Sequence, residues 1–114
     1  MAVDDVLAKR VRTALERQLP IEEKKMFGGI AFMVRGKMCV SVGRDRLMCR
    51  IDPLVHDTVL QHKGCRTMIM RGREYRGYVH IDAEAVKTER ELDFWIALSL
   101  DYNGQLQASL RKRR

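Results

Sequence analysis

Apolar and polar positions follow two different periods along the chain, and the first of them is helical. Apolar residues recur at steps of three and four near the N-terminus, which places them on one stripe of a helix: Val3, Val6, Leu7, Val11, Ala14 and Leu15. Asp4 and Asp5 stand where the helix dipole favours negative charge, and Pro20 disfavours helical geometry at the residue before it. The pattern predicts a helix from about Asp4 to Leu19.

The period then changes to two, which is typical of strands. The paired glycines Gly28-Gly29 permit backbone angles and close approaches that a side chain forbids. No strand is predicted for the charged run over residues 22–25 that precedes them. Alternation predicts three strands after the glycines, at about Ile30–Val34, Lys37–Gly43 and Arg46–Ile51.

The length of the first hairpin loop decides which side chains share a face of the sheet. A two-residue loop at Arg35-Gly36 sets Phe32 opposite Cys39. A three-residue loop with a left-handed Gly36 instead places Phe32 with one apolar set of the following strands. This set contains Ile30, Met38, Val40, Val42, Leu47, Cys49 and Ile51. Burial of one coherent apolar face favours the three-residue loop, which we therefore predict.

The opposite face of these strands is half apolar and half basic, which is unusual for a face in contact with water. It carries Ala31, Met33, Cys39, Ser41, Arg46, Met48 and Arg50. Exposed methionines are typical of adaptable binding surfaces. The alternative is that a helix of the same chain covers this face. The candidate residues for contact with a partner or a second copy of the chain are Met33, Met48, Arg46 and Arg50.

A short helix and two further strands are predicted next. Asp52 caps free amides and Pro suits the first helical position, so a helix over about Pro53–His62 is expected. Strands follow at about Arg66–Met70 and Gly77–Asp82, joined by a connection over residues 71–76.

The last helix opens with the capping-box pattern Thr88-Glu89-Arg90-Glu91 and continues past Gly104 to about Leu110. Its core side is Leu92, Trp95, Ile96 and Ser99. The order α-β-β-β-α-β-β-α predicts an α+β fold, a two-layer sandwich with an antiparallel sheet. We expect a single domain over residues 1–110 and a basic tail over residues 111–114.

The formal net charge of +7 is unevenly distributed. Residues 35–76 hold ten basic and four acidic side chains, whereas residues 77–110 hold two basic and six acidic ones. This pattern suits charge-complementary protein contacts, and the alternative is a nucleic-acid-binding module that uses the basic segment and the tail. The candidate nucleic-acid contacts, beside Arg46 and Arg50, are Arg44, Arg71, Arg73, Arg111, Lys112, Arg113 and Arg114.

The sequence predicts no catalytic residue, no metal site and no cofactor. Three cysteines and three histidines lack the two close ligand pairs of structural zinc, and no nucleophile, phosphate-loop or paired-carboxylate motif is visible. A small enzyme or ligand-binding domain that uses Cys39 or a pocket under Trp95 is a third hypothesis. The acidic start, the odd cysteine count and the lack of a long apolar run predict a cytoplasmic protein without membrane contact.

A family resemblance rests on several segments of the chain, which are Lys25-Met26-Phe27-Gly28-Gly29-Ile30-Ala31-Phe32, Gly36-Lys37-Met38, Leu47-Met48-Cys49-Arg50-Ile51-Asp52, Gly72, Gly77-Tyr78-Val79 and Leu92-Asp93-Phe94-Trp95. With these segments the chain resembles the N-terminal domain of the TfoX/Sxy competence-regulator family over about residues 5–103. Met26, Phe27, Gly28, Gly29 and Gly36 match the family motif. We assign them a structural role in which Phe27 anchors the turn in the core and the glycines permit the bend.

The resemblance implies a secretion-chaperone-like α+β domain with a regulatory, non-enzymatic role in switching on DNA-uptake genes. Full-length regulators of this family carry a second, helical C-terminal domain, and we expect this chain to be a stand-alone first domain. The prediction is therefore a regulatory protein-interaction module, a homodimer whose partner is a protein such as a transcription regulator.

Overall fold

The structure is a computed structural model of the chain, and it describes residues 5–17, 20–26 and 28–112, with side chains described to residue 106 in the last helix. The elements are α1 (Asp5–Glu16), β1 (Glu22–Met26), β2 (Gly29–Val34), β3 (Lys37–Gly43), β4 (Arg46–Arg50), a 3₁₀ turn η1 (Pro53–Val55), α2 (His56–Val59), β5 (Cys65–Met70), β6 (Arg73–Asp82), a second 3₁₀ turn η2 (Ala83–Val86) and α3 (Glu89–Lys112).

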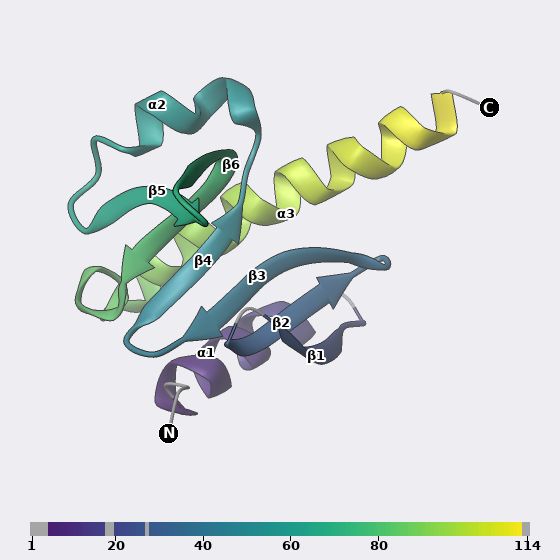
Figure 1. Cartoon of the computed structure of the whole chain (residues 1–114). Coiled ribbons are helices and arrows are strands. Elements are labelled where there is room, and N and C mark those ends of the chain that lie inside the picture. Colours follow the sequence, from purple (N-terminus) through teal and green to yellow (C-terminus); the bar gives the residue numbers. More distant parts are fainter. Residues whose placement is uncertain (1–4, 18–19, 27, 113–114) are drawn as a thin grey trace.

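The strands form one antiparallel sheet in the order β1-β2-β3-β4-β6-β5. Helices α1 and α3 pack together on one face of it, and α2 lies at one end near β5 and β6 (Figure 1). The predicted α+β fold with an antiparallel sheet is confirmed.

The main core fills the space between these two helices and the sheet. Phe32, Val40 and Leu47 of the sheet are fully buried there. Helix α1 adds Leu7, Val11 and Leu15, and α3 adds Leu92, Trp95 and Ile96. This arrangement buries the apolar stripes of both helices against one sheet face, so most of the hydrophobic stabilisation comes from this layer.

The predicted capping box begins α3. The Thr88 hydroxyl accepts a hydrogen bond from the Glu91 backbone N–H at 3.1 Å, and the Glu91 carboxylate accepts one from the Thr88 N–H at 3.0 Å. These contacts satisfy two of the amides that a helix start leaves without partners. The Asp52 carboxylate accepts from the Leu54 N–H at 2.9 Å in the same way, at the start of η1.

Strand β1 was not predicted. All five of its side chains are exposed and four of them are charged, so the segment shows no apolar alternation. Backbone pairing with β2 makes it a strand, from Glu22 opposite Met33 to Met26 opposite Gly29. Charged side chains of this kind are common on edge strands, where they discourage unspecific pairing.

The first hairpin loop has two residues, so the predicted three-residue loop is wrong. Arg35 and Gly36 have φ angles of 53° and 80°, and Val34 pairs with Lys37. A β-bulge farther along the hairpin adds one unpaired residue to β3, because Phe32 opposes Val40 while Met33 opposes Met38.

The bulge preserves the predicted burial of Phe32 but changes two other assignments. Cys39 is the residue left over on β3, and it lies in the main core. Met38 lies on the opposite face of the sheet. The prediction placed each residue on the other side, because it assumed an uninterrupted alternation along β3. The bulge inside the strand reverses that alternation.

Three predicted boundaries are also wrong. The connection over residues 71–76 is a two-residue turn, because Arg71 and Gly72 have φ angles of 54° and 76° and β6 begins at Arg73. The helix predicted over Pro53–His62 is η1 followed by a single helical turn that ends at Val59. The first helix ends at Glu16, and residues 18–19 lie outside the described part of the chain.

Replacement of Phe32 by Ala should lower the free energy of unfolding by about 3–5 kcal/mol, because the ring is fully buried and leaves a cavity. Urea denaturation measures the change. Phe94→Ala is the matched control, since that ring is 42% exposed and its loss should cost about 1 kcal/mol or less. Equal losses at the two positions would contradict the described burial.

Candidate protein-interaction face

The side of the sheet opposite α1 and α3, which we call the second face, carries its own hydrophobic cluster. Its buried members are Ala31, Met38, Met48 and Met68, and Met33, Met70, Tyr75 and Tyr78 pack against them partly buried. No helix residue belongs to this cluster within the described part of the chain. The methionines and tyrosines therefore shield one another from water without a covering layer.

One row of cross-strand neighbours shows how the second face is built. It crosses all six strands through Lys24, Ala31, Ser41, Met48, His80 and Arg66. The four central residues are buried and the two cations at the ends are exposed. The second face thus has an apolar centre between basic margins.

The structure brings the four predicted contact residues to this face. Arg46, Met48 and Arg50 occupy alternate positions of β4, and Met33 lies opposite Met38 on the β2–β3 pair. Arg46 and Met48 line a hollow of about 250 Å³. Arg50 lies at the other end, with its guanidinium 5.6 Å from the centre of the Tyr78 ring.

Sequence reasoning missed three of the five methionines on this face, Met38, Met68 and Met70. Met68 and Met70 alternate on β5, and that spacing could have identified them, but the pairing of β6 with β4, which brings β5 and β6 beside Met48, was not predicted. Met38 was missed because of the β3 bulge. The second face is therefore richer in methionine than the sequence had indicated.

His80 is a titratable group within the buried centre of the second face. Burial, and then the cations Arg46 and Arg66, lower its pKa to about 4. The imidazole is therefore neutral near pH 7, and the surrounding charge on this face is carried by arginine.

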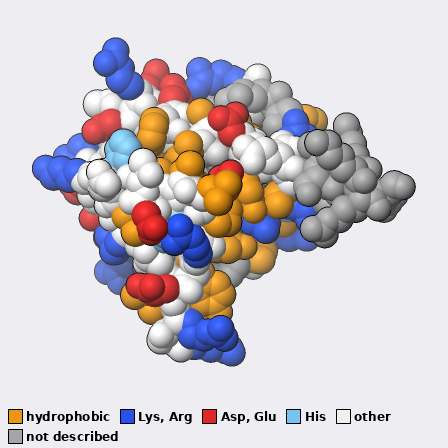
Figure 2. Space-filling model, turned by 90° about the horizontal axis from the view of Figure 1, so that it is seen from above, with side chains coloured by type: hydrophobic (Ala, Val, Ile, Leu, Met, Phe, Trp, Pro, Cys, Tyr) orange, Lys and Arg blue, Asp and Glu red, His pale blue; other side chains and the backbone are white. Residues whose placement is uncertain are grey.

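The predicted nucleic-acid contacts do not form one patch. Arg44 lies in the turn between β3 and β4, whereas Arg71 and Arg73 lie at the turn between β5 and β6, at the opposite end of the sheet. Lys and Arg side chains are spread around the margin of the view from above, with acidic groups between them and hydrophobic ones near the centre (Figure 2). The side chains of residues 111–114 lie outside the described part.

The cysteines do not provide an activated thiolate. Burial raises the pKa of Cys39 to about 12 and that of Cys65 to about 11, and burial also raises the pKa of Cys49. These thiols stay protonated at neutral pH, whereas a cysteine nucleophile needs a lowered pKa. No three His, Cys, Asp or Glu side chains of the described residues are grouped closely enough to hold a metal ion.

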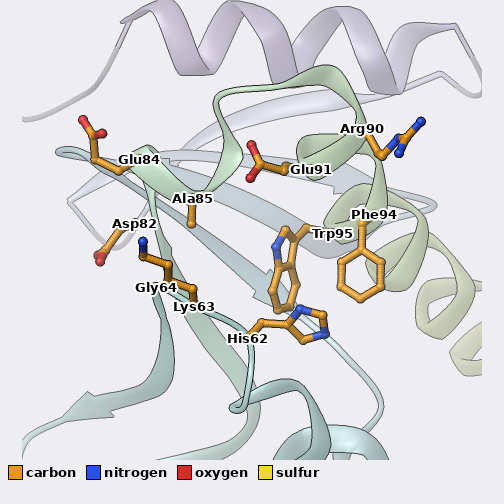
Figure 3. A pocket seen from close by; sticks show the side chains of 10 residues that line it. All are labelled: His62, Lys63, Gly64, Asp82, Glu84, Ala85, Arg90, Glu91, Phe94 and Trp95. Carbon is orange, nitrogen blue, oxygen red and sulfur yellow. The ribbon is translucent and has the colours of Figure 1, made fainter.

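A cavity of about 610 Å³ opens beside Trp95, between the loop before β5, the end of β6 and the first turns of α3 (Figure 3). Three rings form its aromatic wall, with the His62 ring centre 4.8 Å from that of Phe94 and 5.5 Å from that of Trp95. The hypothesis of a small enzyme or ligand-binding domain with a pocket under Trp95 requires a hollow at this place. The volume of this cavity lies within the range of small-molecule sites.

The carboxylates of this cavity all have partners. Asp82 pairs with Arg66, Glu84 pairs with Lys87 at 2.8 Å, and Glu91 belongs to the capping box of α3. No cysteine or serine is among the described residues that line it. These ion pairs and the capping box hold the carboxylates of the cavity in contacts that support the local fold.

Comparison with known families decides the classification. The model of the TfoX N-terminal domain matches residues 13–102, which is most of the chain. The chain belongs to this family. Neither the curated proteins nor the solved structures compared with it include a match. Among the described helices of this TfoX N-terminal domain, none is both long and apolar enough to cross a membrane.

The glycines of the TfoX motif occupy positions that a larger residue would strain. Gly28 and Gly36 have φ angles of 73° and 80°, which side chains rarely adopt. At Gly29 an added Cβ would lie 2.0 Å from the carbonyl oxygen of Val42 on β3. Met26 is exposed at the end of β1, and Phe27 lies outside the described residues.

Replacement of Gly29 by Ala should destabilise the TfoX domain by about 3 kcal/mol, because the new methyl group would overlap the backbone of β3. Gly104→Ala is the control: no atom lies within 4 Å of its added Cβ, and alanine there should stabilise α3 by about 1 kcal/mol. Thermal or urea denaturation distinguishes the two, and an unchanged Gly29→Ala protein would refute the close approach.

Stability should fall as the pH drops from about 6.5 to about 4. The unfolded chain protonates His80 near its ordinary pKa of about 6.5, whereas the folded protein binds that proton only near pH 4. The unfolded state therefore gains protons first as the pH falls, which lowers the free energy of unfolding.

The measurement is urea denaturation at a series of pH values for the wild type and His80→Gln. His56 also has a lowered pKa, mainly through burial, so the variant should lose only part of the pH dependence. Identical pH dependence in the two proteins would contradict a neutral, buried His80.

Proposed function

We propose that this TfoX N-terminal domain is a non-enzymatic regulatory module that binds another protein through the second face of its sheet. The supporting observation is the methionine cluster, in which the described residues that shield Met38, Met48 and Met68 are neighbouring side chains of the sheet. Methionine is unbranched and polarizable, so such a cluster can adapt its shape to a partner.

The charges around the cluster favour an acidic partner. Arg46 and Arg50 flank Met48 on β4, and Lys24 and Arg66 end the central cross-strand row. Of these four cations, only Arg66 has a carboxylate partner among the described residues, Asp82. A segment with apolar anchors and flanking Asp or Glu residues would match this pattern in both shape and charge.

Family membership supports a place in transcription regulation, with a transcription regulator as the partner and the cytoplasm as the location. The nucleic-acid alternative ranks second, because Arg44 lies at the opposite end of the sheet from Arg71 and Arg73. A nucleic-acid module usually gathers its cations on one face.

The test begins with a pull-down from the native host at near-physiological salt, with nuclease treatment to remove bridging nucleic acid. The identified partner is then titrated against the purified wild type and Arg46→Glu. Reversal of this charge should weaken binding about tenfold, and the affinity of the wild type should fall as salt is added.

Arg44→Glu is the matched control, since it makes the same change two residues away in the turn between β3 and β4. Circular dichroism checks that both variants fold. The proposal fails if Arg46→Glu binds as tightly as the wild type, or if Arg44→Glu weakens binding equally.

A further inference from the structure

Strand β1 ends the sheet on one side and presents an unpaired backbone edge. Among the described strands it pairs with β2 alone, and its side chains Glu22, Glu23, Lys24, Lys25 and Met26 are all exposed. Half of the backbone N–H and C=O groups of such an edge have no partner within the sheet, so they are available to another strand. The order of charges on this edge determines which strand fits.

Antiparallel pairing of two identical strands about a two-fold axis places residues of the same face opposite each other. If Glu23 lies on the axis, Glu22 of each copy lies opposite Lys24 of the other. Both side chains lie on the second face, since Glu22 pairs with Met33 and Lys24 with Ala31 within one chain. The symmetry therefore creates two complementary charge pairs at once.

The like charges at the axis are compensated within each chain. Glu23 lies on the helix side of the sheet, where the guanidinium of Arg12 on α1 donates hydrogen bonds to both of its carboxylate oxygens. Two Glu23 residues brought together would each arrive with their own cation. An Arg–carboxylate contact with two bonds is the strongest form of such a pair.

The other possible pairings match less well. With Lys24 on the axis, Glu23 of each copy would lie opposite Lys25 of the other, but both oxygens of the Glu23 carboxylate already accept hydrogen bonds from Arg12. The two lysines at that axis would face each other, and their cross-strand neighbour Ala31 provides no acid. The edge at β5 carries a single charged residue, Arg66, so self-pairing there brings together no opposite charges. Docking of two second faces would bring the basic margins of both copies, with Arg46 and Arg50, into one interface.

We infer that two copies of this chain join through their β1 strands, antiparallel and centred on Glu23, into one continuous sheet. The occupant of the free edge is thus a second copy of the chain. This inference concerns the edge of the sheet and stands whether or not the second face binds a partner.

The pairing has a geometric consequence for the second face. A two-fold axis through an antiparallel strand pair is perpendicular to the sheet, so both second faces lie on the same side of the dimer. A partner with two matching segments could then bind both at once, with the second contact made at a high effective concentration.

Charge exchange tests the register. The dimer dissociation constant is measured on the purified protein by analytical ultracentrifugation across a concentration series. Glu22→Lys and Lys24→Glu should each weaken the dimer about 10- to 100-fold, because each puts two like-charge pairs in place of two opposite ones. The double variant E22K/K24E should restore dimerisation to near the wild-type level.

Lys25→Glu is the matched control. In the Glu23-centred register this residue faces Ile21 of the other copy, so its charge reversal should leave the dimer nearly unchanged. In a register centred on Lys24, Lys25→Glu would instead place a second carboxylate opposite Glu23 of the other copy and weaken the dimer. Glu22→Lys would have little effect in that register. All changed positions are exposed, and circular dichroism confirms that each variant folds.

A wild type that stays monomeric at millimolar concentration would overturn the inference. So would a dimer that Lys25→Glu disrupts and Glu22→Lys leaves intact, or single charge reversals that the double exchange does not repair. None of these measurements involves the partner of the second face, so their failure is distinct from failure of the proposed function.

Discussion

The register between β2 and β3 is the constraint on which the remaining structure depends. The two-residue turn at Arg35 and Gly36 alone would have brought Phe32 opposite Cys39 and divided the apolar residues between two faces. The bulge at Cys39 lets Phe32 meet Val40, so the helix side receives a continuous apolar layer. The same bulge sends Met38 to the other side, where it completes the methionine cluster. One extra residue thus supports both the core and the second face.

The features that the sequence predicted well are those in which side chains alone determine structure. The stripe on α1, the capping box at Thr88 and the alternation of β4 are local patterns, and each reports directly which side is buried. From β4 alone, the second face could be predicted as partly apolar and partly basic, because Arg46, Met48 and Arg50 alternate with Leu47 and Cys49.

The features that could not be predicted depend on backbone pairing. Strand β1 has no buried side chain, so no periodicity marks it. The start of β6 at Arg73 and the position of the bulge follow from hydrogen bonds between strands, which side-chain type hardly reports. The complete methionine cluster needed the pairing of β6 with β4, a contact between strands that the alternation within one segment does not contain.

The attachment of β1 has a consequence for how the sheet opens. This strand is held by backbone pairing with β2 and by the contact between Arg12 and Glu23, and it buries no side chain of its own. Segments with so little burial detach in small fluctuations, well below the free energy that unfolds the whole domain. In a single copy of the domain, amide protons of β1 should therefore exchange with solvent long before those of β3 and β4, so the sheet of the monomer has a loosely held border beside a rigid centre.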